Sequence, residues 1–129
     1  MSLYRLFSQT GTKAVFIAPQ DSTQRMSFFS TSTPKKVSGV SLLNRRVEIR
    51  VGRSVDPRGA ECTDCTKVRE PLSATITFSG STTAEAQASL ALMKQDLIDA
   101  INAKWEELVT IGVAPQDNTG LNYNETVAP

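Results

Sequence analysis

The sequence has no histidine among its 129 residues, so the side chain that most often acts as a general base is missing. It also lacks the phosphate-binding patterns GxxxxGK[ST] and GxGxxG and the nucleophile motif GxSxG. Acidic pairs do occur, Asp96 with Asp99 and Glu106 with Glu107, but helical spacing places them on a solvated side. The sequence therefore predicts a protein that is not an enzyme and takes no cofactor or small-molecule substrate.

Long hydrophobic runs are also absent, since no stretch of 18 or more apolar residues occurs, and we expect no membrane span. The first residues, "MSLYRLFSQTGTK", lack the apolar core and cleavage site of a secretory signal, so we expect a product made in the cytosol. A chain of this length is typical of one domain, which we predict over residues 1–129.

Cysteine is scarce, and both copies, Cys62 and Cys65, lie in the short stretch "ECTDC". A zinc site needs about four ligands, and the two cysteines of one chain supply only half of them, so we predict no metal site within one chain. A site shared between two copies would have all four ligands. The pair lies between two predicted strands rather than at a helix start, which argues against a redox motif. Two interpretations of the pair remain. The thiols are idle on the surface, or they form cross-links from one loop to two neighbouring copies.

The net charge is only +1, but its distribution is uneven. Nine basic and four acidic residues lie between Lys35 and Arg69, whereas seven acidic residues and two lysines follow Gly80. Such asymmetry indicates either a face for a polyanion or chance clustering on a solvated surface.

Short apolar runs dominate the first part of the chain. Residues 3–9 and 13–19 flank Thr10-Gly11-Thr12, a spacing that predicts an N-terminal hairpin within residues 1–20. A main sheet is predicted over residues 24–79, beginning with a strand at 24–32 that ends before Pro34.

The strongest strand signal begins at Arg46, where polar and apolar residues alternate. Taking Asn44-Arg45 as a two-residue turn places Ser41 opposite Glu48 and gives one basic-polar and one apolar face. The basic-polar face then carries Arg46, Glu48 and Arg50, and the apolar face carries Val47, Ile49 and Val51. Residues 72–80 alternate as well, which directs Leu72, Ala74, Ile76 and Phe78 toward a core.

Helical periodicity follows over residues 83–111. Thr82 and Glu85 fit a capping box, Gly112 is a plausible stop, and Asn102 divides the region into helices at about 83–101 and 103–111. One stripe is apolar: Ala86, Leu90, Met93, Leu97, Ile101, Trp105 and Leu108. Residues 115–129 read as an extended C-terminal tail.

These elements predict an α+β fold, with an antiparallel sheet of five or six strands followed by two C-terminal helices. Two short helices are too few to cover the apolar face of such a sheet. We therefore expect a second copy to cover it, the alternative being a monomer with a small core.

The order of these features resembles the coat proteins of single-stranded RNA bacteriophages of the levivirus type. The resemblance rests on "RRVEIRVGRS" leading into "ECTDC" and then "SATITFSGSTTAEAQASLALMKQDL", and covers residues 35–115, with residues 1–34 similar only in pattern. It implies an intertwined homodimer, a T=3-like icosahedral virion shell around genomic RNA, and production in the cytoplasm of a bacterial host. Members of this family also repress translation by binding an RNA hairpin.

The resemblance also implies roles for particular residues. Cys62 and Cys65 occupy the loop that links neighbouring subunits in several family members, although a disulfide within so short a loop competes. The dimer core would contain Val47, Ile49, Val51, Ile76, Phe78, Leu90, Leu97 and Trp105. RNA would contact Lys35, Ser41, Arg46, Arg50, Thr75 and Thr77 on the other sheet face, unless Arg46 and Arg50 simply pair with Glu48. The competing function is a dimeric regulatory protein that binds RNA or DNA without assembling.

Overall fold

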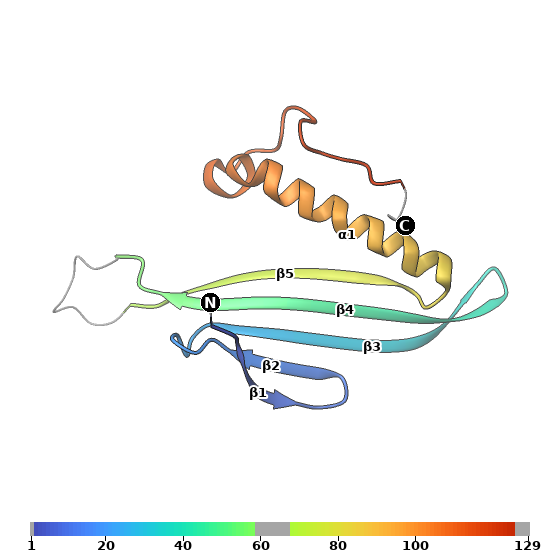
Figure 1. Ribbon diagram of the computed structural model, residues 1–129, viewed down its shortest axis with the longest axis horizontal. Coiled ribbons are helices and arrows are strands. Elements are labelled where there is room, and N and C mark those ends of the chain that lie inside the picture. Colours follow the sequence, from blue (N-terminus) through green and yellow to red (C-terminus); the bar gives the residue numbers. More distant parts are fainter. Residues whose placement is uncertain (1, 59–67, 126–129) are drawn as a thin grey trace. The chain divides into compact units, whose positions relative to one another are not determined.

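The computed structural model describes residues 2–58 and 68–125 (Figure 1). The chain divides into two compact units, residues 1–79 and residues 80–129. The elements are β1 (Arg5–Gln9), β2 (Lys13–Ile17), β3 (Arg25–Val37), β4 (Val40–Val55), β5 (Glu70–Ser81), α1 (Ala84–Trp105) and the π-helix η2 (Glu106–Ile111). Strands followed by helical structure confirm the predicted α+β class.

The five strands form one sheet in the order β1-β2-β3-β4-β5, which confirms the predicted antiparallel sheet. The predicted N-terminal hairpin is present, and the backbone N–H of Thr10 donates to the carbonyl of Lys13 at 2.8 Å. β2 pairs with β3 only over Arg25–Phe29. β3 and β4 continue beyond this hairpin, and their turn end projects past the end of β5 as a two-stranded ribbon (Figure 1).

The turn between β3 and β4 lies at Ser38-Gly39, so the turn predicted at Asn44-Arg45 is wrong. Ser38 has φ 49° and Gly39 has φ 82°, the positive values that a type I′ hairpin turn requires at both central residues. Val37 therefore pairs with Val40, and Asn44 pairs with Thr33 in mid-strand. Glycine reaches this conformation without steric cost, which is why the chain reverses here.

β3 also runs through Pro34, past its predicted end. The N–H of Ser30 points toward β2 and donates to the carbonyl of Thr12 at 2.9 Å. Because successive N–H groups alternate between the two sides of a strand, the nitrogen of Pro34 points to the same side, where β2 has already ended. Pro34 therefore removes no hydrogen bond from the β3–β4 ladder, and it blocks pairing along this free edge.

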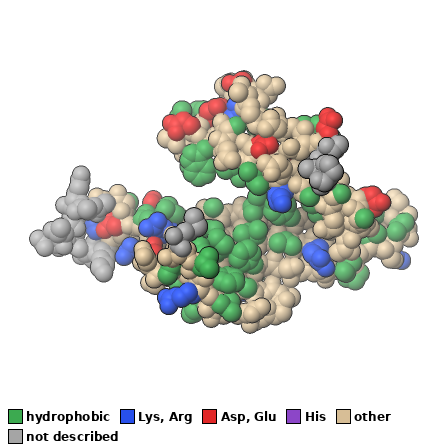
Figure 2. Space-filling model, viewed as in Figure 1, with side chains coloured by type: hydrophobic (Ala, Val, Ile, Leu, Met, Phe, Trp, Pro, Cys, Tyr) green, Lys and Arg blue, Asp and Glu red, His purple; other side chains and the backbone are tan. Residues whose placement is uncertain are grey.

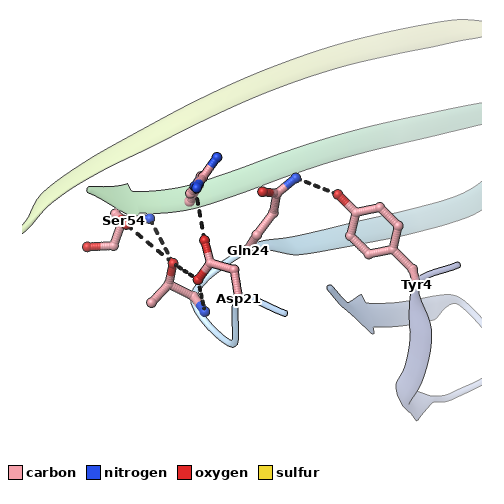
Figure 3. A network of polar contacts seen from close by, with 6 residues as sticks. Tyr4, Asp21, Gln24 and Ser54 are labelled. Carbon is pink, nitrogen blue, oxygen red and sulfur yellow. Dashed lines mark hydrogen bonds and ion pairs between the residues drawn. The ribbon is translucent and has the colours of Figure 1, made fainter. Parts of the chain in front are cut away.

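A polar network ties the β2–β3 connection to the end of β4 (Figure 3). The hydroxyl of Thr23 donates to Asp21 Oδ1 at 2.7 Å, and the N–H of Ser54 donates to Thr23 Oγ1 at 3.2 Å. Arg53 Nε lies 3.0 Å from Asp21 Oδ2. The bonds from Thr23, reinforced by Arg53, lower the pKa of Asp21. The network fixes the end of β4, which closes at Val55.

A single α-helix, α1, followed directly by η2, covers the region predicted as two helices divided at Asn102. Thr83 rather than Thr82 is its N-cap, because Thr83 Oγ1 accepts from the N–H of Ala86 at 3.3 Å. α1 continues through Asn102, since a single asparagine costs less than about 0.7 kcal/mol in a helix and good helix formers surround it. The predicted stop is confirmed: Gly112 has φ 86° and its N–H donates to the carbonyl of Glu107 at 2.9 Å.

Residues 113–125, here called the strap, run back along α1 in the C-terminal unit (Figure 1). Asp117 Oδ1 lies 2.8 Å from the ammonium of Lys104, which is only 3% exposed. Further along the strap, Asn122 Nδ2 donates to Asp99 at 3.2 Å and the N–H of Asn124 donates to Asp96 at 2.9 Å. The tail is thus fastened to the helix at three points.

The Asp117 contact predicts acid sensitivity of the strap. The hydrogen bond from Lys104 and that from the N–H of Thr119 lower the pKa of Asp117 to about 2, below the 3.8 of a free carboxyl. The contact therefore stabilises the strap above about pH 4, and this stabilisation is lost as the pH falls toward 2. The NMR shift of the Thr119 amide, which donates to Asp117, should follow this loss, and Asp117→Asn should remove that pH dependence. An identical acid response in both proteins would contradict it.

Candidate functional site

The two faces of the sheet differ in chemistry, as the alternation in β4 predicted. In the observed register Val47, Ile49 and Val51 lie opposite Ser30, Phe28 and Met26 of β3. The rings of Phe28 and Phe16 meet edge to face at 5.8 Å. We call the set Phe16, Met26, Phe28, Val47, Ile49 and Val51 the apolar sheet face; its members are only half-buried in the single chain.

The C-terminal unit also leaves apolar side chains exposed. Ile101 is 45% exposed and Trp105 is 55% exposed, and they share one side of α1. We call Met93, Leu97, Ile101, Trp105 and Leu108 the helix stripe. The strap binds Asp96 and Asp99, which point away from this stripe, and it therefore leaves the stripe open.

The single chain has almost no core among the residues that the structure describes. Val15, at 8% exposure, is the one buried hydrophobic residue in these ranges. Of the predicted dimer-core residues, Leu97 and Trp105 are exposed and the others are half-buried. Hydrophobic side chains instead gather on the surface of the sheet unit (Figure 2). Apolar burial is the main favourable term in folding, and a contiguous exposed apolar surface is typical of interaction sites.

The edges of the sheet are not equally protected. β1 is five residues long, with an irregular register between Leu6 and Ser8 that is typical of a bulge. The free part of β3 carries Pro34 and Lys36, two residues that discourage pairing. β5 ends the strand order, has twelve residues and contains no lysine or arginine. The outer edge of β5 is therefore the long edge that remains open to a further strand.

The opposite face of the sheet is basic. Arg46 and Arg50 of β4 lie opposite Thr31 and Ser27, on the side away from Val47. Glu48 lies between the two arginines, with one carboxylate oxygen 2.6 Å from Arg50 and the other 3.9 Å from Arg46. One carboxylate faces two guanidinium groups, so pairing with Glu48 leaves this face positive. We call Lys13, Arg25, Phe29, Arg46 and Arg50 the basic sheet face.

Most of the predicted RNA-binding residues share this face. Asn44 Nδ2 donates to Ser79 Oγ at 3.5 Å, which places Ser79 on the same side as Asn44 and Arg46. Alternation along β5 then brings Thr75 and Thr77 to this side as well. Lys35, opposite Leu42, has the same parity. Ser41 does not: the continuous strand from Val40 gives it the parity of Val47, so it lies on the apolar side.

Sequence reasoning missed three members of the basic sheet face. Lys13 pairs with Phe29 across β2 and β3, and its ammonium lies 5.1 Å from the centre of that ring. Arg50 Cζ lies 5.8 Å from the same ring, and Arg25 Cζ lies 5.0 Å from the ring of Phe7. The available signal was the alternation within the first strands, which needs the β2–β3 register before it assigns a face.

The predicted disulfide residues, Cys62 and Cys65, lie outside the described residues, and their pairing stays a prediction. Within residues 2–58 and 68–125, no helix is long and apolar enough to cross a membrane.

No protein-family model matches the sequence, and no curated protein matches it either. Solved structures, in contrast, match this chain. The virus-like particle of bacteriophage PQ-465 is similar with a TM-score of 0.77 and 27% identity, covering 88% of this chain and 90% of that chain.

Two further virus-like particles have the same fold at lower identity. That of bacteriophage ESE001 has a TM-score of 0.62 at 15% identity and covers 98% of this chain and 100% of that one. That of Wenzhou levi-like virus 4 has a TM-score of 0.64 at 16% identity and covers 98% and 87%. The chain thus shares its fold, over nearly its whole length, with virus-like particles of levi-like bacteriophages, which confirms the resemblance predicted from the sequence.

Proposed function

We propose that this chain is a structural capsid protein, acting as one coat-protein domain over residues 1–129. Its copies would dimerise and build an icosahedral, T=3-like shell around single-stranded RNA in a virion assembled in a bacterial host. The similarity to phage virus-like particles supports the capsid role. The observation that carries self-association is the open β5 edge of a sheet whose apolar face is left uncovered in one chain.

Pairing of β5 with the β5 of a second copy fits the observed edges. Two copies related by a two-fold axis present the same strand to each other in antiparallel orientation, so each satisfies the other's backbone groups. The same association would bury the helix stripe and the apolar sheet face. Each large apolar side chain that becomes fully buried contributes about 1.5–3 kcal/mol. The predicted dimer core, Val47, Ile49, Val51, Ile76, Phe78, Leu90, Leu97 and Trp105, is retained in this proposal.

Electron microscopy of the purified protein, with light scattering on the same sample, tests assembly. Closed particles of uniform size are expected. A homogeneous dimer that forms no particles would instead favour a regulatory nucleic-acid-binding protein, and a stable monomer would overturn self-association altogether.

RNA is the proposed ligand of the basic sheet face. Lys35, Arg46 and Arg50 would contact phosphates, and Thr75 and Thr77 would hydrogen-bond sugars or bases. Ser41 is left out of this set because it lies on the apolar side. The same surface would bind an RNA hairpin to repress translation.

Replacing Arg46 and Arg50 by alanine should weaken RNA binding and flatten its dependence on salt. Each lost phosphate contact lowers the slope of log K against log salt by about 1, so a decrease of about 2 is expected. The matched control is Arg45→Ala with Arg53→Ala, which removes the same charge from the odd-numbered side of β4. Filter binding from low to high salt measures both pairs. Equal slopes for the two double variants would contradict the assignment.

Cross-linking between subunits remains a proposal for Cys62 and Cys65. Non-reducing gels of purified particles should then show covalent ladders that end at rings of five and six subunits. A Cys62→Ser, Cys65→Ser variant should lose these ladders while still forming particles.

A further inference from the structure

We propose that the β3–β4 ribbon of one copy docks on the η2 segment of a second copy, where Glu106 and Ile111 receive it. The ribbon comprises residues 31–45, and the docking face is its side that continues from Val47. The proposal rests on the proposed function and deepens it, because it names a contact that joins one dimer to the next.

Pairing through β5 cannot build a shell by itself. A two-fold contact uses the same surface on both copies and closes at two. Contacts that continue beyond a dimer join two different surfaces, and they form rings when the rotation closes. The far edge of the sheet is β1, whose irregular register disfavours a further strand. The second contact is therefore expected outside the strand edges.

The ribbon is a segment that the single chain leaves without support. Its turn end projects past the end of β5, and residues 31–41 are all exposed (Figure 1). A two-stranded hairpin is marginally stable in water by itself, so docking on another surface would stabilise the ribbon. On the docking face, Leu43 lies opposite Pro34 and is 42% exposed. This pair forms the apolar centre of the face.

The ribbon is also strongly basic. Residues 31–46 contain four cations and no carboxylate. Lys36 and Arg45 flank the apolar centre on the docking face, whereas the other two cations lie on the side assigned to RNA. Neither Lys36 nor Arg45 has an ion-pair partner among the residues that the structure describes. An apolar centre between two cations fits a partner surface that is apolar and acidic.

The η2 segment offers a surface of this kind. Ile111 is 62% exposed, and Glu106 is exposed without an ion-pair partner in the described part of the chain. Because π-helical hydrogen bonds join residues five apart, Glu106 and Ile111 lie on the same side of η2. Residues 80–129 contain seven acidic residues and two lysines, and one of these, Lys104, already binds Asp117. Charge therefore favours attraction between this unit and the ribbon of another copy.

Lys36→Glu tests the contact by charge reversal. It should leave the dimer intact and raise the protein concentration needed for particle formation by at least about 10-fold, because like charges would meet across the interface. Glu106→Lys alone should have the same effect. The two substitutions combined in one chain restore opposite charges, so particles should form again. Light scattering over a dilution series measures this concentration.

Arg5→Glu and Glu125→Lys are the matched controls, because each makes the same charge change at another exposed position. Both should assemble as the wild type does. Particles formed by Lys36→Glu as readily as by Arg5→Glu would overturn the contact. A lower salt slope of RNA binding in Lys36→Glu would overturn it as well, since the docking face would then bind RNA rather than protein.

Cross-linking tests whether the ribbon and η2 of different copies meet. Leu43→Cys and Ile111→Cys are made in separate chains that both carry Cys62→Ser and Cys65→Ser, and one chain is lengthened by a tag. After the two are mixed and assembled, a bismaleimide should join tagged to untagged chains, and no such product would overturn the contact. Wild-type protein that forms no particles would instead overturn the proposed function, and the cross-link would then test the contact independently.

Discussion

Ile101→Asp is expected to leave the protein as a monomer that forms no particles. Ile101 lies in the middle of the helix stripe and is 45% exposed in the single chain. A carboxylate there remains solvated as long as the chain is alone. In an association that buries the stripe, the carboxylate loses water without gaining a partner, at a cost of several kcal/mol, and the isoleucine contribution of about 1.5–3 kcal/mol is lost as well. Size-exclusion chromatography with light scattering measures the outcome.

Ala88→Asp provides the control for this variant. Ala88 is an exposed position of the same helix, and at about 100° per residue it points away from the helix stripe. It introduces the same charge and should leave assembly intact. Particles formed by Ile101→Asp as readily as by Ala88→Asp would show that the stripe is not an interface.

Gly120→Ala is expected to release the strap from α1. Gly120 has φ 81°, and a Cβ added there would lie 2.5 Å from the Cβ of Ala103. Real Cβ atoms do not approach so closely, and alanine at this φ is also strained. Together these effects cost about 1–3 kcal/mol, which is comparable to what the few hydrogen bonds of the strap supply. Hydrogen exchange at residues 121–125 should speed up by about 5- to 150-fold.

Gly11→Ala is the matched control for Gly120→Ala. An added Cβ at Gly11 meets nothing within 4 Å, and its backbone is not in the left-handed region. This variant should leave exchange in the strap unchanged. If Gly120→Ala also leaves exchange there unchanged, then the close contact with Ala103 does not hold the strap.

Regular alternation and strong local signals were sufficient to predict part of the fold. The β1–β2 hairpin, the two faces around Val47 and Arg46, and the stop at Gly112 all follow from neighbouring residues. The β3–β4 turn does not, because the ribbon beyond β2 is solvated on both faces and shows no consistent alternation from residue 31 to 45. The sequence holds two turn signals here, Ser38-Gly39 and Asn44-Arg45, and residues 31–45 carry no alternation that would favour the first.

The face of a site residue was predictable where alternation within its own strand decides it, as for Arg46 with Arg50 and for Thr75 with Thr77. Arg46 and Arg50 are separated by an even number of positions on β4, so strand alternation alone predicts that they share a face. Phe29 and Lys13 become neighbours only through the β2–β3 register, and Ser41 changes face with the position of the turn. The strap contacts of Asp117 and Asn124 were missed for a similar reason, since polar tail residues carry no periodicity that identifies a partner helix.

The unequal edges of the sheet determine how far it can grow. In the proposed dimer, joined through β5, the combined sheet would end at both sides in β1, a short strand with an irregular register, while Pro34 interrupts the exposed backbone of β3. Further strands would then find no regular template, so addition would stop at a closed pair. Edges of this kind disfavour the open-ended strand addition that builds fibrils.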